Sequence, residues 1–462
     1  MLYGWRRAIE YELQAPLYFA VLALWRELNT SVWFARLFSI LCATGFFIAL
    51  GPILRRVAPQ RRAFWAALFI ALNPFVLYTA FDIRLYAPAL LLSALGWLAF
   101  EAGFVSGRGA GARFYFVVLG IVSLYTQYFL GFALVGYAAT LVATGRFRSL
   151  ASYAATLVPI ALAGLPLLGI VRSQIGGSGE TTASATSLLR QTLVHPWLDF
   201  VLPYDSAWNA LHARGAYVAL VFVAIVLIAA ARPRRSSAFA GALACAATIE
   251  LLFVTVVLVF RLDLDTRHYV VLFVPSMIAG YALVTAIEDG PWPQVGRLFR
   301  YVYVLLTVAA LYAAHHQVAQ DGDSKRVAAY LEAHASPQAV IAVFPADALP
   351  AYARQYRGGA RLVPFPQPLG AKSYDISAID VRDEAEALAA LARLRGAAQT
   401  WLVMLGSCDS AAAKYGCHHV LAAIADGSRV RSERRFYDSR VFALMRVRAA
   451  PERHSGPPQR RR

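Results

Sequence analysis

Long hydrophobic runs separated by short polar loops fill the chain from residue 33 to residue 317. The runs are close to the ~20 residues that cross a ~30 Å hydrocarbon core as an α-helix, and none alternates like a barrel strand. We therefore predict a polytopic α-helical membrane protein. Its ten expected spanning helices are 33–53, 62–80, 85–103, 113–128, 129–145, 151–170, 214–231, 238–260, 268–287 and 299–317.

Every second loop between these runs is rich in arginine. The basic loops are 55–62, 107–113, 145–148, 231–235 and 296–300. Because positively charged loops stay in the cytoplasm, the remaining loops and everything after residue 317 are expected to face outward. The outward set includes residues 81–88, the turn at Gln127, the long loop 171–213 and the stretch 261–267.

The first 32 residues do not complete this topology. The apolar segment 15–25, APLYFAVLALW, is too short to span and suits an interfacial or re-entrant helix. The helix at 33–53 must nevertheless begin outside. We therefore expect residues 1–32 to be part of a first outward loop, and the sequence to start too late and to lack a first transmembrane helix.

Beyond residue 317 the hydrophobic pattern changes. Runs typical of strands (339–344, 361–365, 400–405) alternate with runs typical of helices (349–356, 384–394). This alternation predicts a small outward α/β domain over residues 318–449, after a transmembrane domain over residues 33–317. The end, residues 450–462, is rich in proline and arginine and is expected to be disordered.

Composition agrees with a membrane protein, since 59% of residues are hydrophobic and 15% are charged. The net charge of +17 does not indicate nucleic-acid binding, because the arginines lie in short loops between apolar runs. Cys42 and Cys245 fall inside apolar runs and are expected to be buried. Cys408 and Cys417 lie in the polar C-terminal part and could form a disulfide in an oxidising compartment.

Two outward loops place ionisable residues beside the hydrocarbon. The stretch 81–88 reads FDIRLYAP, in which Asp82 and Tyr86 share one face if a helix has already begun, and Arg84 points elsewhere. A second cluster, RHY at 267–269, opens another predicted helix. Interfacial anchoring explains any one such residue. The two clusters together favour a site for an anionic headgroup, because guanidinium binds phosphate bidentately.

At these residues the sequence resembles the GT-C superfamily of integral membrane glycosyltransferases, in the branch of protein O-mannosyltransferases and bacterial aminoarabinose (lipid A) transferases. The segment QAPLYF (14–19) is similar to the family's H-P-P-L-Y-Y, and the following LWRELNTSVWFARLFSIL to its W-x-x-L-F-G-x-S-E-x-x-x-R-L-x-S. FDIRLYA (81–87) resembles Q-E-A-R-M-Y-A, LYTQYF (124–129) resembles L-Y-T-H-Y-F, and RHYVVLFVPSMIAG (267–280) resembles R-x-Y-L-L-P-x-x-P. Order and spacing agree over roughly residues 10 to 320.

The resemblance implies inverting transfer of a sugar from a polyprenyl-phosphate donor to a lipid, glycan or protein acceptor at the outer face of the membrane. In the family, an acid just after the first transmembrane helix is the general base for the acceptor. That segment has no counterpart here, and the nearest carboxylates are Glu10 and Glu12. Gln14, Ala15, Phe81 and Gln127 depart from the family pattern, which leaves the identity of the sugar open.

Candidate roles follow from the motifs. The catalytic candidates are Asp82, Glu12 and Glu10. The candidates for binding the donor phosphate are Arg84, Tyr86, Arg267, Tyr269 and His268. The candidates for the acceptor or its loop are Gln14, Tyr18, Gln127, His195 and Asp199. We expect no cofactor; a divalent metal in the loop 171–213 is the alternative, although the spacing there matches no known ligand set.

Two other functions compete with the transferase. A transporter or flippase of lipid-linked sugars needs ionisable groups inside the membrane, and Glu250 is the one carboxylate near the middle of a predicted span, since Glu101 lies near an end. A noncatalytic relative that binds polyprenyl phosphate is the other. The usage of alanine and arginine suggests a bacterial genome, so we expect the inner membrane, with the active face and the C-terminal domain periplasmic.

Overall fold

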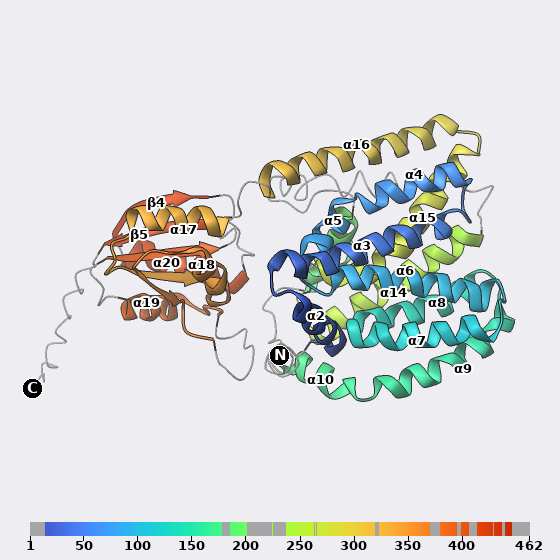
Figure 1. Cartoon of the computed structure of the whole chain (residues 1–462), viewed down its shortest axis with the longest axis horizontal. Coiled ribbons are helices and arrows are strands. Elements are labelled where there is room, and N and C mark those ends of the chain that lie inside the picture. The colour runs from blue at the N-terminus through green and yellow to red at the C-terminus, as the bar shows by residue number, and fades with distance from the viewer. Residues whose placement is uncertain are drawn as a thin grey trace, which may run out of the picture. The chain divides into compact units, whose positions relative to one another are not determined.

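The chain folds into two compact units, Met1–His316 and Gln317–Arg462. A computed structural model describes residues 14–177, 185–200, 224, 237–262, 264, 266–318, 323–369, 379–394, 399–405, 414–427, 429–436 and 439–445 (Figure 1). The first unit is helical, and the second is built around a β-sheet. Each unit is described by itself.

The first unit is a bundle of helices, several of which lie side by side along one direction (Figure 1). Its long elements are α2 (Pro16–Leu28), α3 (Val32–Leu54), α4 (Gln60–Ala71), α5 (Pro74–Phe81), α6 (Tyr86–Phe100), α7 (Ala110–Thr126), α8 (Gly131–Ala143), α9 (Phe147–Gly164), α10 (Leu167–Gly177), α11 (Ala185–Asp199), α14 (Ser237–Phe260), α15 (Val270–Glu288) and α16 (Pro293–Val318). Its short elements are the π-helix η1 (Glu101–Val105) and the 3-10 helices η2 (Tyr128–Leu130) and η5 (Thr266–Tyr269).

The membrane character predicted from the sequence is confirmed in the described part of the chain. Five helices there are long and apolar enough to span: Val32–Leu54, Tyr86–Val105, Phe147–Gly164, Ser237–Phe260 and Arg267–Glu288. The pair α4 and α5, bent by 55°, makes a sixth if it is one broken span.

Of the other four predicted spans, three do not meet the length and hydropathy expected of a spanning helix, and the fourth lies outside the described residues. The segments expected at 113–128 and 129–145 are apolar but shorter helices, Ala110–Thr126 and Tyr128–Ala143. The segment expected at 299–317 belongs to α16, which is not among the candidate spans, and 214–231 lies outside the described residues except for position 224. The segment expected to be an interfacial helix, 15–25, is the 13-residue helix α2.

The bend between α4 and α5 has a local cause. Pro74 opens α5, and a residue that precedes proline avoids helical geometry, so α4 stops before Asn73. The buried Asn73 side chain accepts a hydrogen bond from the amide of Phe75 at 2.9 Å. Its amide nitrogen donates to the carbonyl of Phe200 at 2.6 Å and to the hydroxyl of Tyr303 at 3.1 Å. These bonds fix the direction of α5 and hence the position of the turn that follows it.

Close helix contacts explain why small residues lie inside the bundle. A Cβ atom added to Gly136 of α8 would stand 2.7 Å from the sulfur of Cys245 in α14. Glycine therefore lets α8 and α14 approach closely, which is how membrane helices gain packing energy without a hydrophobic driving force. Nearby, Phe100 stacks on Tyr137 at 4.6 Å between ring centroids.

The second unit is a five-stranded sheet covered on both faces. Its strands are β1 (Val340–Phe344), β2 (Arg361–Pro364), β3 (Thr400–Leu405), β4 (Arg429–Arg435) and β5 (Ser439–Met445), in the order β2-β1-β3-β5-β4. The pairs β1–β2 and β1–β3 are parallel, with Val340 opposite Arg361 and Thr400, whereas β5 pairs antiparallel with β3 and β4.

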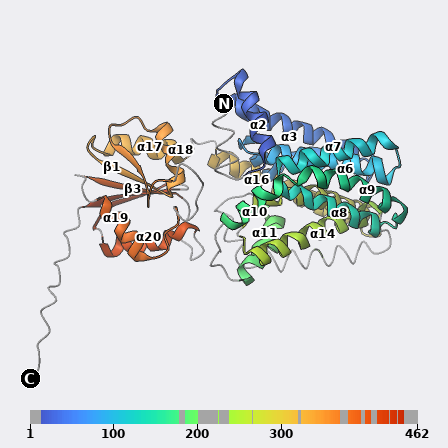
Figure 2. The same ribbon diagram turned by 90° about the horizontal axis from the view of Figure 1, so that it is seen from below.

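Successive side chains of β1 pack alternately into two hydrophobic cores, one on each face of the sheet. Ile341 and Val343 pack on α17 (Asp323–His334) and α18 (Leu349–Gln355), while Ala342 and Phe344 pack on α19 (Glu384–Arg393) and α20 (Cys417–Gly427). Figure 2 shows the two helix pairs on opposite faces of the sheet. The alternation of side chains along a strand produces this three-layer arrangement.

The small α/β fold expected for the C-terminal part is confirmed, and all five runs singled out in the sequence form the elements expected of them. The sequence pattern did not predict the strand β4, RVRSERR, because an exposed edge strand need not alternate apolar and polar residues. Cys417 is disulfide-bonded, whereas Cys42 and Cys245 are free thiols. Cys408 lies outside the described residues.

Candidate functional site

The turn between α5 and α6 holds the first group of predicted site residues. Asp82 ends α5 in an extended conformation, with φ −80° and ψ 134°, and α6 begins only at Tyr86. Asp82 and Tyr86 therefore do not share a helical face, contrary to the arrangement considered from their spacing. The hydroxyl of Ser39 in α3 donates to the carbonyl oxygen of Asp82 at 2.9 Å, which ties the turn to α3.

Three arginines from three different segments act on the half-buried Asp82 side chain. Burial raises the pKa of its carboxyl above the ordinary value. The positive charges that oppose this effect are, in order, those of Arg84, Arg267 and Arg36. Three guanidinium groups and one carboxylate leave two net positive charges, so this group of residues attracts an anion.

The cluster at 267–269 lies against the turn, although about 180 residues separate them in the sequence. The guanidinium carbon of Arg267 lies 5.8 Å from the centre of the Tyr86 ring, and the His268 ring meets Tyr86 edge-on at 6.3 Å. The buried Tyr86 ring thus positions both basic side chains at the start of α6.

The turn after α7 joins the same group through an aromatic contact. The ring of Phe129 in η2 meets His268 edge-on at 6.0 Å and packs on Phe253 of α14 at 5.2 Å. Gln127, the residue that ends α7, is 5% exposed, and neither of its amide atoms has a hydrogen-bond partner in the described part of the structure. A buried amide without partners costs free energy, so Gln127 is an exception among the buried polar groups described here.

Tyr18 in α2 belongs to the motif QAPLYF (14–19) and lies close to the residues around Asp82. Its side chain is 3% exposed, and its pKa is raised by burial and by the charge of Asp82, while Arg84 acts in the opposite direction. The Tyr18 hydroxyl has no hydrogen-bond partner among the residues described. Gln14, at the start of the described residues, is half-buried and precedes α2.

Tyr269 lies deeper than the other candidates. It is 1% exposed, its hydroxyl donates to Thr192 of α11 at 3.1 Å, and its ring packs on Phe253 at 4.3 Å. This packing suits a residue that positions η5 rather than one that touches a ligand. His195 and Asp199 belong to the same helix α11, but their side chains are outside what the structure describes, as are Glu10 and Glu12.

We call the end of the helical unit where these segments meet the motif end; it comprises residues 14–18, 36–39, 82–86, 127–129 and 267–269. Arg36 and Ser39 were not among the predicted site residues, although they are the Arg and Ser of the R-L-x-S motif in the sequence. That motif was the signal that could have identified them. Within the described residues, no group of three His, Cys, Asp or Glu side chains has the geometry of a metal site.

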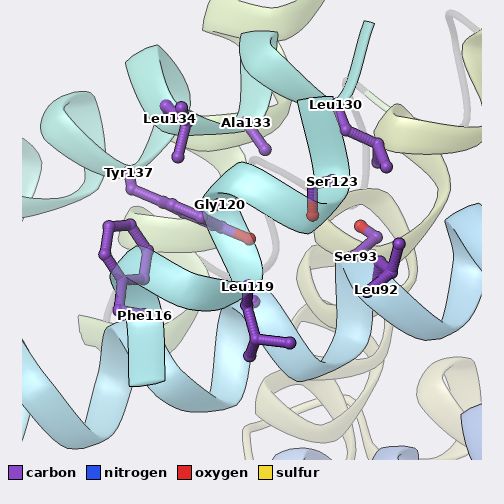
Figure 3. A pocket seen from close by; sticks show the side chains of 11 residues that line it. Leu92, Ser93, Phe116, Leu119, Gly120, Ser123, Leu130, Ala133, Leu134 and Tyr137 are labelled. Atoms are coloured by element: carbon purple, nitrogen blue, oxygen red, sulfur yellow. The ribbon is translucent and has the colours of Figure 1, made fainter. Parts of the chain in front are cut away.

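A small enclosed cavity elsewhere in the unit is not this site. It measures about 20 Å³, lies between α6, α7 and α8, and is lined by Ser93, Ser123 and Tyr137 among apolar residues. Figure 3 shows the Ser93 and Ser123 hydroxyls facing the same space. A cavity of this size and polarity fits one water molecule and is too small for a sugar.

Comparisons with known proteins give a likeness at the level of structure only. No protein-family model matches the sequence, and no curated protein is significantly similar to it. Solved structures similar to the chain include ArnT from Cupriavidus metallidurans bound to undecaprenyl phosphate, with a TM-score of 0.45 and 16% sequence identity. The apo state of the same protein has a TM-score of 0.40 and 18% identity. Both matches cover 94% of this chain and 88% of the other.

Proposed function

We propose that this protein is a membrane glycosyltransferase that moves a sugar from a polyprenyl-phosphate donor to an acceptor hydroxyl at the motif end, which faces outward. The observation that carries the proposal is the meeting of five motif segments, far apart in the sequence, at the end of the unit that holds Asp82 and three arginines. Residues that serve only as interfacial anchors have no reason to converge on one point, whereas residues that build a binding site do.

The donor phosphate is assigned to Arg84 and Arg267. Both guanidinium groups are close enough to Asp82 to influence its charge, and Arg84 is exposed and therefore accessible. Arginine suits this task because its planar group binds two phosphate oxygens at once and stays charged at every physiological pH. Tyr86 and His268 hold Arg267 and the start of α6 in place.

The proposed reaction needs a charged leaving group and a base. The acceptor oxygen attacks the anomeric carbon, the bond from that carbon to the phosphate oxygen breaks, and the electron pair leaves with the polyprenyl phosphate. The acceptor proton passes to a carboxylate. Fixed arginines near the phosphate stabilise the negative charge that develops on the leaving oxygen, so no general acid is required.

Asp82 is assigned to orienting the arginines rather than to taking the proton. The charges of three guanidinium groups act on its carboxylate, and we assign it the role of a counter-charge that keeps them in position before the donor binds. The carboxylates suggested as base by the sequence, Glu10 and Glu12, lie outside the described residues. The sugar and the acceptor are not assigned.

One observation favours a transporter of lipid-linked sugars as a second candidate. Glu250 is 9% exposed inside the span α14, and neither carboxyl oxygen has a hydrogen-bond partner in the described parts of the chain. Unpaired carboxylates inside a membrane often lie on an ion path. Glu250 stands one helical turn before Phe253, however, so it is also close to the aromatic residues beneath the motif end.

The test is transfer of radiolabelled sugar from polyprenyl-phosphate donors in membranes that contain the full chain. Two variants are compared, Arg84→Ala and the control Arg26→Ala, which removes another exposed arginine of the same unit. Among the described residues, the Arg26 guanidinium donates to the carbonyl of Thr30. Transfer that is lost in the first and kept in the second supports the proposal.

Two other outcomes contradict it. Donor binding that depends on Arg84 without any covalent transfer by the wild-type chain identifies a noncatalytic binding protein. Movement of the intact donor across vesicles, lost in Glu250→Gln, identifies a transporter.

A further inference from the structure

A second basic site lies at the opposite end of the helices from the motif end. A cavity of about 510 Å³ opens between α3, α6 and α7, beside the loop 55–62 that follows α3 and the loop 107–113 that leads into α7. We call this end, defined by those two loops, the basic end. Arg55, Arg56 and Arg108 line the cavity together with an apolar wall that includes Leu95, Leu98 and Leu119. Its volume is typical of small-molecule sites.

The cavity is separate from the proposed catalytic site. α6 and η1 run without a break from Tyr86 at the motif end to Val105, which is 20 residues. At 1.5 Å per residue, Leu98 lies roughly 18 Å along this axis from Tyr86. The two sites are thus at the two ends of one membrane-spanning element.

The arginines of the basic end are not all used by the protein itself. Arg56 pairs with Glu101 at 3.0 Å, and Arg113 and Arg146 donate to the carbonyls of Gly103 and Val105 in η1. In the described structure, the guanidinium groups of Arg55 and Arg108 have no such partner. Both are exposed, and Arg108 stands between Gly107 and Gly109, whose φ angles of +65° and +92° shape a tight loop.

The charge of the cavity is therefore unbalanced. Three arginines line it, and Glu101 offsets one of them, which leaves two net positive charges beside an apolar wall. Tyr115, an exposed residue of α7, completes the rim, and tyrosine at this position is typical of the headgroup level of a bilayer. A soluble anion would not contact the leucines, and a neutral lipid would not neutralise the arginines, so the lining favours a ligand that has both an anionic and an apolar part.

We propose that this cavity binds the headgroup of an anionic phospholipid, with the phosphate between Arg55 and Arg108 and the acyl chains along Leu95, Leu98 and Leu119. Basic pockets between membrane helices at the positively charged side recognise such headgroups through the same combination of charge and apolar surface. The proposal is independent of the glycosyltransferase assignment, because it uses none of the residues of the motif end.

The test measures lipid binding by native mass spectrometry of the purified full chain, with phosphatidylglycerol and phosphatidylcholine as probes. We expect preferential binding of phosphatidylglycerol, and a loss of about fivefold in affinity for each of Arg55→Gln and Arg108→Gln. The matched control is Arg61→Gln, which removes an exposed arginine of the same loop that does not line the cavity.

A second measurement separates lipid from free anion and guards against misfolding. Phosphatidylglycerol in phosphatidylcholine nanodiscs should raise the melting temperature of the wild type and of Arg61→Gln but not of the double variant Arg55→Gln/Arg108→Gln, whose melting temperature in phosphatidylcholine alone should equal that of the wild type. Equal binding of phosphatidylglycerol by all variants overturns the proposal. Equal stabilisation by inorganic phosphate also overturns it, because the site then recognises an anion without its lipid.

Discussion

The motif end and the basic end of the helical unit both carry arginines, but the protein holds these arginines in different ways. At the motif end, the charges of three arginines from separate segments act on one half-buried carboxylate, Asp82. At the basic end, Arg56 pairs with Glu101 and Arg62 with Glu288, while the guanidinium groups of Arg55 and Arg108 have no acidic partner among the described residues. The positive charge left for a ligand therefore surrounds one carboxylate at the motif end, whereas at the basic end it belongs to the arginines that have no acidic partner.

The two ends also differ in whether their buried polar side chains have partners. The motif end keeps buried polar atoms without partners at Gln127 and Tyr18, at a cost in stability. At the basic end, Glu288 is 7% exposed but lies within ion-pair distance of both Arg62, at 3.7 Å, and Arg300, at 3.2 Å. The buried polar groups of the motif end thus lack partners, whereas the buried carboxylates of the basic end lie in ion pairs.

The largest effect should come from removing a phosphate-binding arginine at the motif end. We expect Arg267→Ala to lower kcat/KM for sugar transfer by roughly 10²- to 10³-fold, because a fixed positive charge near the leaving oxygen acts mainly in the transition state. Arg267→Lys should recover part of the loss, since it keeps the charge without the bidentate geometry. If Arg267→Ala transfers sugar at the wild-type rate, the motif end is not the catalytic site.

A smaller loss is expected for Asp82→Asn, roughly 10- to 100-fold in transfer rate, because the arginines lose the charge that orients them. The dependence of transfer activity on pH tests the same role of Asp82. Burial raises the pKa of Asp82, so the carboxylate takes up a proton at a higher pH than an exposed aspartate does, and activity should fall as the pH is lowered. This acid-side fall should be shifted or absent in Asp82→Asn. An unchanged acid limb in the variant argues against the orienting role.

Gln127→Leu should change stability and ligand binding in opposite directions. Replacing a buried amide that lacks partners by a similar-sized apolar side chain should stabilise the protein by about 1 kcal/mol and weaken donor or acceptor binding by about fivefold. Thermal unfolding and KM measurements check the two halves. A variant that is both less stable and fully active shows that Gln127 is structural.

The smallest effect on activity is expected from Glu288→Gln at the basic end. Its partners Arg62 and Arg300 are 44% and 39% exposed, so solvent screens the ion pairs and their loss should cost about 1 kcal/mol of stability. Sugar transfer at a temperature well below unfolding should stay at the wild-type rate. A loss of transfer comparable to that of Asp82→Asn would remove the distinction between the two ends.

The elements of the fold follow closely from local patterns in the sequence. Hydropathy alone located six of the spanning helices, one of them bent, because burial in lipid demands long apolar runs whatever they pack against. The bend at Pro74 lies within one of these six, and the end of α7 at Gln127 leaves the predicted spans 113–128 and 129–145 as shorter helices. In the C-terminal unit, β1, β2 and β3 follow from their apolar residues, while the arginine-rich edge strand β4 depends on its pairing with β5.

The candidate site was recognised from the sequence only in part. Motifs singled out Asp82, Arg84, Tyr86 and the cluster at 267–269, yet their spacing suggested a helical face shared by Asp82 and Tyr86 that does not exist. Arg36 and Ser39 were overlooked, because an arginine and a serine at the start of an apolar helix look like ordinary interfacial residues. Their contribution depends on how α3 packs against the turn after α5.

The sequence by itself determined that most of this protein is helical and lies in a membrane, that a small α/β unit follows, and which residues carry chemistry near the ends of helices. Those properties depend on local composition and periodicity. Only the tertiary structure decided that Tyr18, Asp82, Phe129 and Arg267 meet at one end, and that Arg55 and Arg108 remain available at the other. The physical reason is that helix packing sets which distant charges share a low-dielectric space, and the pattern along a single helix contains no information about its neighbours.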